Sequence, residues 1–311
     1  MRIASTRLIT RLTAALAAAV TLALPAGAAF GRSVDEHRAA DPQGQVEIIV
    51  VTGRVDVVGW DKPEIEVAST LGADVEKLDI TTAGSRTTVR AVLSHTSGTH
   101  SNSGAGDSGA NLIVHVPQKS SLTAALITAD LTVKDLQGNQ NVHTVSGDIT
   151  TVTVGEARVR TVSGDVRLTA GPGSQLLEVA TVSGDVHIAG AGGEVSVNTV
   201  SGDATLALAT VSRAHLKTVS GDFAVTLALA PDGRFEAQSY SGNLTVNFPD
   251  GLPPAEFDVQ SFSGELSTCF GRKPAKESYG PGSRLSFREG AGTGQVRIDS
   301  KSGDVSLCAK R

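Results

Sequence analysis

Large aromatic side chains are scarce in this chain, which limits the kinds of core that it can build. Aromatic residues make up 4% of its 311 residues, and Trp60 is the single tryptophan. Valine, threonine and serine are abundant instead, together with 34 glycines. This composition argues against ordinary helical packing and suits pleated sheets joined by tight turns. We therefore expect an all-β fold.

Excess positive charge and catalytic motifs are also missing. The formal net charge of −5 provides no basic footprint for nucleic acid. The sequence has neither the Gly-x-Ser-x-Gly elbow of serine hydrolases nor the His-Glu-x-x-His helix of metalloproteases. Its recurring carboxylates sit at the turns of a repeat, and no cluster of unlike residues interrupts that repeat. These absences predict a protein that is not an enzyme, needs no cofactor and binds no nucleic acid.

Long apolar runs are absent except near the N-terminus. Arg2, Arg7 and Arg11 lead into the apolar run Leu12–Leu24, and a stretch of small residues follows it. This is the layout of a cleaved signal peptide, assigned to residues 1–28, since a membrane span needs about 20 apolar residues. The mature chain is therefore expected to be exported without a transmembrane segment, to the periplasm, the cell surface or the medium.

Beyond the signal peptide the sequence divides into three parts. Residues 29–44 are polar and carry no apolar period, which indicates a linker. Residues 45–120 contain short alternating apolar runs separated by turn residues, which predict an N-terminal β-strand segment. Residues 121–311 contain a repeat.

The repeat is marked by the tripeptide Ser-Gly-Asp or a close variant. Successive glycines lie 17 to 22 residues apart, except for a final gap of 39. Two further segments, Thr128–Leu131 and the residues around Gly282, resemble degenerate copies of the repeat. Self-similarity at a nearly fixed period indicates a repeat architecture, because one repeat cannot bury its own apolar face. The clear copies have their glycine at positions 147, 164, 184, 202, 221, 242, 264 and 303.

Each copy has the same pattern of apolar and polar residues around its glycine. Positions Gly+2, Gly+4 and Gly−5 are mostly apolar, whereas Gly−4 and Gly−6 are mostly polar. This alternation predicts a strand, a turn and a second strand in every copy. We expect a β-solenoid, or flattened β-helix, of about nine rungs. A two-sheet β-sandwich is the alternative, although a sandwich has no reason to repeat one turn eight times.

The repeated turn admits a structural and a metal-binding interpretation. Glycine supplies a positive φ, and serine and aspartate side chains bond to nearby backbone groups. Stacked threonines at Gly−3 would add hydroxyl ladders. Alternatively, the aspartates form a column that collects Ca²⁺, but Asn243 and Glu265 in two copies favour a structural turn. The candidate calcium column comprises Asp148, Asp165, Asp185, Asp203 and Asp222.

Position Gly−2 is apolar where alternation would place it outside. Either the corner or the N-terminal strands cover this column, or it is an exposed stripe for a partner. The column ends in Tyr240 and Phe262, which with Trp60 form the candidate binding face.

The two cysteines share a position in the repeat. Cys269 and Cys308 both stand at Gly+5 of their copies, and an exported compartment permits a disulfide. If they lie one rung apart, their Cα atoms are about 5 Å apart and can be bridged. If Gly282 marks a full intervening rung, the gap is about 10 Å and no bond forms undistorted. We predict the disulfide, with residues 271–282 as an excursion.

Taken together, several segments resemble the bacterial putative-adhesin family of exported β-strand-repeat proteins, a family of unknown function. They are Val55-Asp-Val-Val-Gly-Trp-Asp61, Leu112-Ile-Val-His-Val-Pro117 and the Ser-Gly-Asp series, and the resemblance covers residues 45–311. It implies a β-repeat fold in a surface or periplasmic setting, and it supplies no catalytic residues.

The leading hypothesis is an adhesive or structural interaction protein of the bacterial envelope that acts through its repeated β faces. Its partner would be an envelope or surface component, either a glycan or a protein. The alternative is a periplasmic module that binds a glycan or small ligand near Trp60 and reports on the state of the envelope. The repeat predicts no particular oligomeric state.

Overall fold

The repeat region winds as a parallel β-solenoid. The computed structural model describes residues 32–94, 109–171, 173–276 and 281–309, which belong to one compact unit, and in these residues all regular structure is β-strand. The predicted signal peptide lies outside the described residues. The strands of the first seven rungs are β7 (Ser121–Lys134), β8 (Gln140–His143), β9 (Ile149–Thr153), β10 (Ala157–Ser163), β11 (Val166–Ala170), β12 (Leu176–Ser183), β13 (Val186–Ala189), β14 (Gly193–Ser201), β15 (Ala204–Ser220), β16 (Phe223–Ser241) and β17 (Leu244–Phe248).

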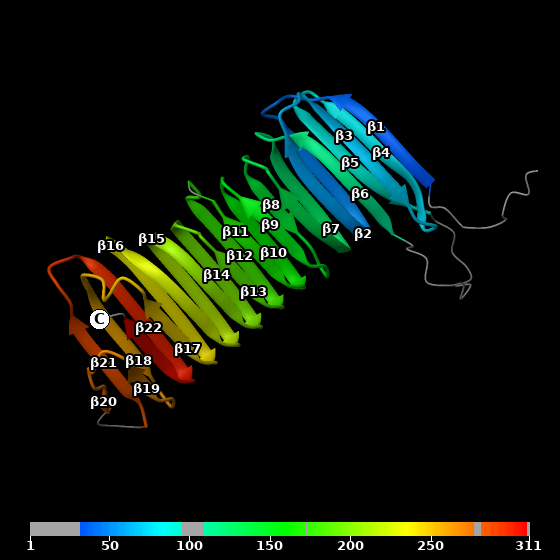
Figure 1. Cartoon of the computed structure of the whole chain (residues 1–311). Coiled ribbons are helices and arrows are strands. Elements are labelled where there is room, and N and C mark those ends of the chain that lie inside the picture. Colours follow the sequence, from blue (N-terminus) through cyan, green and yellow to red (C-terminus); the bar gives the residue numbers. More distant parts are fainter. Residues whose placement is uncertain (1–31, 95–108, 172, 277–280, 310–311) are drawn as a thin grey trace, which may run out of the picture. The chain divides into compact units, whose positions relative to one another are not determined.

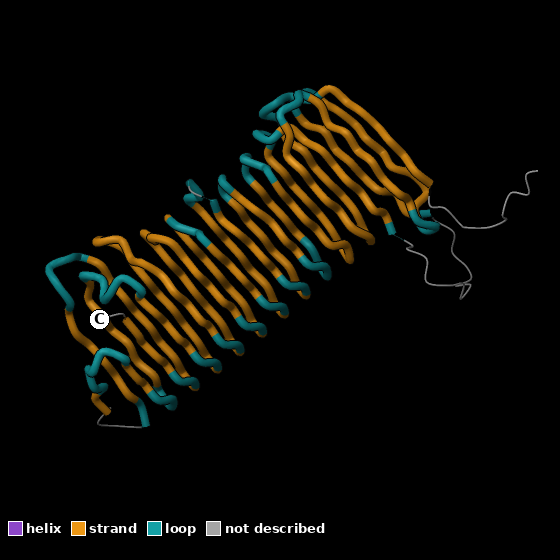
Figure 2. The backbone as a smooth tube through the Cα atoms, viewed as in Figure 1, coloured by secondary structure: helices purple, strands orange, loops and turns teal. Residues whose placement is uncertain are grey.

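Successive rungs pair in parallel, with equivalent repeat positions in register. Val159 of β10 pairs with Val179 of β12, which pairs with Val197 of β14. The strands after the turn behave in the same way, since β11 pairs in parallel with β9 and β13. Consecutive strands of a sandwich are mostly antiparallel, so this register confirms the solenoid over the alternative fold. Figure 2 shows the Ser-Gly-Asp turns in a row along one edge of the stack.

Inward side chains from the two strands of each rung form the core. The strand β10 alternates buried and outward residues, with Val159 and Thr161 inside and Arg160 and Val162 outside. Most buried side chains are valine, leucine, isoleucine or alanine, as the shortage of aromatics predicts. The large exceptions lie in the later rungs, where Phe223, Phe235, Phe248 and Phe257 are all fully buried.

The N-terminal segment continues the same stack. Its strands are β1 (Arg32–Ala39), β2 (Gln45–Trp60), β3 (Glu64–Leu71), β4 (Val75–Ala83), β5 (Arg86–Leu93) and β6 (Ala110–Pro117). Strand β2 pairs in parallel with β7 along both halves of that rung, and β5 and β6 pair in parallel with the two halves of β2. Antiparallel strands then close this end, β4 on β5 and β3 on β6.

The segment expected to be a linker contains a strand. Within residues 29–44, β1 pairs antiparallel with β3 from Arg32 to Ala39. It is an edge strand and all eight of its residues are exposed or half-buried, so it needs no apolar alternation. Charged residues on an edge strand also discourage pairing with another chain, which explains why this strand reads as polar sequence.

At the C-terminal end the last rung in sequence is not the last in space. The strands here are β18 (Ala255–Ser261), β19 (Leu266–Thr268), β20 (Ala275–Lys276), β21 (Ser283–Arg288), β22 (Gly294–Ser302) and β23 (Val305–Ala309). Strand β22 lies between β16 and β18 (Figure 1), and β23 lies between β17 and β19. The chain therefore completes one rung, leaves it, and returns to insert its final rung beneath.

The copy suggested around Gly282 is not a rung. Strand β21 begins at Ser283 and pairs antiparallel with the free edge of β18, and β20 pairs antiparallel with β21. This excursion covers the C-terminal edge of one sheet. Counted from β7, the stack has nine rungs, with turns at Ala129 and at the eight repeat glycines.

Candidate functional site

The repeated glycines are required by the close approach of neighbouring rungs. A Cβ atom built on Gly184 would lie 2.3 Å from the carbonyl oxygen of Gly164, and one built on Gly202 would lie 2.3 Å from that of Gly184. The same contact, at 2.0 to 2.3 Å, recurs at every repeat glycine. The expected positive φ is present at Gly184, Gly202 and Gly221, with values of 156 to 159°, and the direct stacking of the glycines adds a stricter requirement that applies to every copy.

The aspartates that follow these glycines form a hydrogen-bonded ladder. The backbone N–H of Asp165 donates to Oδ1 of Asp148 at 3.0 Å, and the N–H of Asp185 donates to Oδ1 of Asp165 at 3.0 Å. The ladder runs from Asp130 to Glu265 through every rung. Asn243 takes part through its own Oδ1, which accepts from the N–H of Asp304 at 3.0 Å. The turn therefore uses a short side chain with an acceptor oxygen.

The carboxylate ladder does not gather three ligands at one point. In the part of the chain that the structure describes, one group of three potential metal-binding side chains lies within reach of a common ion: Asp35, His37 and Glu66. They belong to β1 and β3, and their nitrogen–oxygen separations of 3.5 and 4.0 Å are those of loose ion pairs. The candidate calcium residues are thus spread along the stack, one to each rung.

Substituting Asp185 tests what the ladder needs. Asp185→Asn keeps an acceptor for the N–H of Asp203 and should leave the free energy of unfolding nearly unchanged, whereas Asp185→Ala should lower it by about 1 kcal/mol. Urea unfolding measures both, with and without Ca²⁺. If Ca²⁺ stabilises the wild type and the asparagine variant loses that gain, the calcium interpretation holds instead.

The threonines at Gly−3 do not form the expected hydroxyl ladder. Their side chains are buried, but the hydroxyls of Thr144, Thr161, Thr181, Thr199 and Thr218 have no hydrogen-bond partner among the described residues. In the later rungs serine stands here and does find one, since Ser239 and Ser300 donate to the carbonyls of Gly242 and Gly303.

The Gly−2 side chains form an exposed apolar ridge. The valines are 44 to 48% exposed, and Tyr240 and Phe262 are 65 and 61% exposed. Neither the corner nor the N-terminal strands cover them, because the alternation of each strand continues to the turn and directs this position outward. We call this set the Gly−2 ridge; it comprises Ile127, Val145, Val162, Val182, Val200, Val219, Tyr240 and Phe262.

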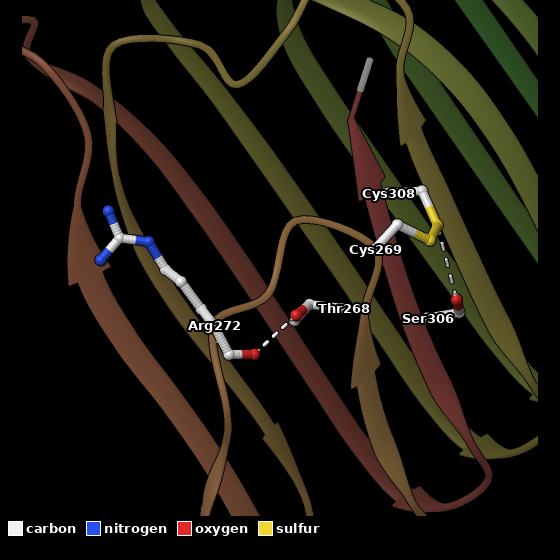
Figure 3. Close-up of a disulfide and its surroundings, with 5 residues drawn as sticks. All are labelled: Thr268, Cys269, Arg272, Ser306 and Cys308. Carbon is white, nitrogen blue, oxygen red and sulfur yellow. Dashed lines mark hydrogen bonds between the residues drawn. A yellow bond between two sulfur atoms is a disulfide. The ribbon is translucent and has the colours of Figure 1, made fainter. Parts of the chain in front are cut away.

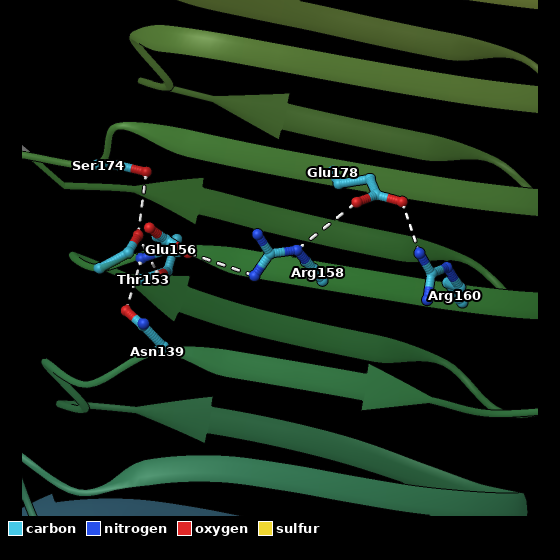
Figure 4. Close-up of polar contacts among 8 residues, drawn as sticks. Asn139, Thr153, Glu156, Arg158, Arg160, Ser174 and Glu178 are labelled. Atoms are coloured by element: carbon cyan, nitrogen blue, oxygen red, sulfur yellow. Dashed lines mark hydrogen bonds and ion pairs between the residues drawn. The ribbon is translucent and has the colours of Figure 1, made fainter.

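Polar columns flank the ridge on the same sheet. At Gly−4 and Gly−6, Arg158 and Arg160 both pair with Glu178 of the next rung, at 3.6 and 2.7 Å (Figure 4). Exposed pairs of this kind contribute little stability, but they keep this part of the sheet charged. On the other side of the ridge run the turn serines and the aspartate ladder. The ridge is thus an apolar strip between two polar borders.

A shallow groove opens beside the C-terminal end of the ridge. It has a volume of about 340 Å³. Its walls come from the Gly−4 to Gly−2 positions of three adjacent rungs, on β15, β16 and β22, and they include Lys217, Gln238, Tyr240, Asp299 and Lys301.

A family model described as Toastrack DUF4097 matches residues 61–308. The chain belongs to the Toastrack DUF4097 family. The resemblance to bacterial β-strand-repeat proteins that the sequence motifs suggested is therefore confirmed.

Two solved structures are similar to this Toastrack chain. A putative cell adhesion protein from Clostridium sporogenes is similar over 90% of this chain and 100% of its own, with 10% identity and a TM-score of 0.29. A putative adhesin from Bacteroides fragilis is similar over 89% of this chain and 97% of its own, with 11% identity and a TM-score of 0.41. No match was found among curated proteins.

The structure does not bring the three predicted binding-face residues together. Trp60 ends β2 and pairs with Pro117 of β6, whereas Tyr240 and Phe262 lie several rungs away on β16 and after β18. The Trp60 ring stacks on His115 at 5.0 Å, and its Nε1 donates to the carbonyl of Glu64 at 2.8 Å. Trp60 therefore has a local structural role in this Toastrack chain.

Tyr240 and Phe262 are not direct neighbours either. The inserted strand β22 places Lys301 between them, since Ser239 pairs with Ser300, and the N–H of Phe262 donates to the carbonyl of Ser300. Sequence reasoning missed Lys301 because its copy is the last in the chain, and sequence order would place that copy beyond Phe262 and not between Tyr240 and Phe262. The sequence does contain a signal for this residue, because Lys301 is the one charged residue at the Gly−2 position among the nine rungs.

The same insertion brings the cysteines together. Cys269 and Cys308 are joined by a disulfide with a Cα–Cα distance of 4.8 Å (Figure 3). The cysteines follow β19 and lie in β23, which are adjacent strands. The disulfide thus connects the inserted rung to the rung that covers it. Next to it, Thr268 donates to the carbonyl of Arg272 at 2.6 Å and closes the turn that leaves β19.

Among the described residues no helix is long and apolar enough to cross a bilayer.

Proposed function

We propose that this Toastrack chain is a non-catalytic, exported protein of the bacterial envelope that adheres to an envelope or surface component through the Gly−2 ridge. The observation that carries this proposal is the exposure of eight apolar side chains in one line, seven of them on consecutive rungs from Ile127 to Tyr240. Contiguous exposed apolar surface is uncommon on soluble proteins and marks interaction sites. An outward position that only contacts water is usually polar, as the Gly−4 and Gly−6 positions are. The apolar residues at Gly−2 therefore indicate a contact with something other than water.

The spacing of the ridge suits a repetitive partner. Neighbouring rungs lie about 4.8 Å apart, so nine rungs present a strip about 38 Å long. Each residue offers only a small contact, but many equivalent contacts on one rigid scaffold add up to a useful affinity. The opposite sheet offers no comparable strip, because its Gly+3 positions are mostly threonine, alanine, serine, arginine and histidine.

The groove beside Tyr240 supports a second candidate, a glycan- or ligand-binding module that reports on the state of the envelope. Ligand sites combine apolar or aromatic walls with a few polar groups. Tyr240 supplies an aromatic wall, and the polar groups come from Lys217, Gln238 and Asp299. The sequence analysis expected the binding site of this module near Trp60, whereas the groove lies near the opposite end of the stack, on β15, β16 and β22.

A pair of charge insertions tests the ridge. Val145→Lys with Val200→Lys puts two charges into the Gly−2 ridge, and Thr150→Lys with Thr205→Lys puts two charges onto the opposite face of the same two rungs. All four residues are exposed. We expect the ridge variant to lose retention on isolated envelope fractions about tenfold or more and the opposite-face variant to keep it.

Circular dichroism and thermal melting of both variants check that the solenoid is intact. Equal loss in the two variants would mean that added charge, not the ridge, controls binding. Undiminished retention of the ridge variant would contradict the proposed function.

A further inference from the structure

The C-terminal end of the Gly−2 ridge differs from the rest. Over the first rungs the ridge carries only isoleucine and valine, but the last three rungs in space carry Tyr240, Lys301 and Phe262. Two exposed aromatic rings are therefore separated by one rung that presents an ammonium group. Because two rung spacings amount to about 10 Å, the rings stand roughly one disaccharide apart along the stack.

The side chains around this end can form hydrogen bonds and ion pairs. Lys301 is 59% exposed, and its Nζ lies 4.0 Å from Oδ1 of Asp299, which is too long for a tight pair. Lys217 is exposed and has no ion-pair partner among the described residues. Gln238 and Gln260 lie at the neighbouring Gly−4 positions, and Gln260 holds Asp299 through a 2.9 Å hydrogen bond to its Oδ2. Two ammonium groups and the Asp299 carboxylate thus line the groove, next to amide groups that can hydrogen-bond to hydroxyls, and positive charge is in excess.

We propose that Tyr240, Lys301 and Phe262 form a binding site for a linear glycan that carries carboxylates on its sugars. In this site the two rings contact the apolar faces of two sugars that are separated by one intervening sugar, and Lys301 pairs with a carboxylate on that intervening sugar. Lys217 and the glutamines contact the same chain from the groove side. The inference rests on the proposed function and narrows it to one partner class at one end of the ridge.

The same residues argue against a second copy of the chain as the occupant of this end. If two ridges met face to face in register, Lys301 would face its counterpart, and two unpaired ammonium groups in an apolar contact are costly. An apolar peptide would likewise leave Lys301 and Lys217 without partners. A partner with regularly spaced anionic groups and apolar ring faces satisfies the aromatic and the charged residues together.

Oligosaccharide binding to the full chain tests the site. The probes are octasaccharides of hyaluronan, galacturonate and mannuronate, each with its carboxyl methyl ester as the uncharged control. We expect at least one acid form to bind more tightly than its ester. Tyr240→Ala and Phe262→Ala should each raise its dissociation constant about tenfold, and Lys301→Gln should raise it about threefold without affecting the ester. Lys134→Gln is the matched control, because Lys134 is an exposed lysine of the first rung, five residues after the turn residue Ala129.

Each outcome separates the two proposals. If no acid octasaccharide binds, or acid and ester bind equally, the glycan inference is overturned, and the adhesive function stands as long as the Val145/Val200 variant still loses envelope retention. If that variant keeps its retention, the adhesive function fails whether or not the oligosaccharides bind.

Discussion

Replacing Gly202 with alanine should lower the free energy of unfolding by about 3 kcal/mol or more, an unusually large effect for one methyl group at an edge turn. The new Cβ would lie 2.3 Å from the carbonyl oxygen of Gly184. The position of this Cβ is fixed by the backbone of residue 202, and the oxygen belongs to the backbone of Gly184. No side-chain rotation can therefore relieve the contact. The two rungs must separate locally, which strains ladder bonds such as the 3.1 Å bond from the N–H of Asp203 to Asp185.

Since each rung touches only its neighbours, the clash weakens one interface in the middle of the stack. Urea unfolding followed by circular dichroism measures the loss, and hydrogen exchange locates it at β12 to β15. Gly171→Ala is the matched control, because its Cβ would meet only the Val154 side chain at 3.3 Å and the carbonyl of Thr153 at 3.5 Å. Equal effects at both glycines would refute the stacking account of the repeat.

Removing the disulfide should have the second large effect. The Cys269→Ala, Cys308→Ala double variant opens a loop of 39 residues, and the chain-entropy model gives a loss of about 4 kcal/mol for a loop of that length. The loop contains the excursion and most of the inserted rung, so the bond restricts the part of the chain that must thread between two existing rungs.

Hydrogen exchange should therefore show β18 to β23 losing protection first in the double variant, while β8 to β15 keep theirs. The wild type treated with a reductant should behave like the double variant, and the reductant should not change the double variant further. If reduction leaves the wild-type stability unaltered, the disulfide does not hold the inserted rung.

The regular part of this structure could be predicted from the sequence because it depends on local pattern. Alternation around each glycine placed Val159 inside and Arg160 outside, and the tolerance of asparagine at position 243 indicated a structural turn. The solenoid followed from a turn that recurs with little change. The shared Gly+5 position of the cysteines also suggested adjacent rungs.

The order of the last rungs could not be predicted from that pattern. Every rung carries the same inward pattern of apolar residues, so Ala237 of β16 is equally suited to pack on Ile298 of β22 or on Val259 of β18. The pattern alone therefore suggests that the rungs stack in sequence order. The structure pairs Ile298 with both Ala237 and Val259. This insertion places Lys301 between Tyr240 and Phe262, and it therefore shapes the candidate site.

Two smaller expectations failed for physical reasons. An edge strand such as β1 carries no buried face, so polarity alone made residues 29–44 look like a linker. The Thr181 hydroxyl is directed inward with its strand, where the described residues offer it no acceptor. The later rungs place serine at this position, and Ser239 reaches the carbonyl of Gly242.

The glycine-stacked turns present the Gly−2 ridge, which is the proposed binding surface. Carbene footprinting of the full chain, free and bound to isolated envelope fractions, tests this most directly. We expect reduced labelling at the ridge from Ile127 to Phe262 and unchanged labelling at the outward positions of β9, β11 and β13. Protection of that opposite face, with the ridge still labelled in the bound state, would contradict it.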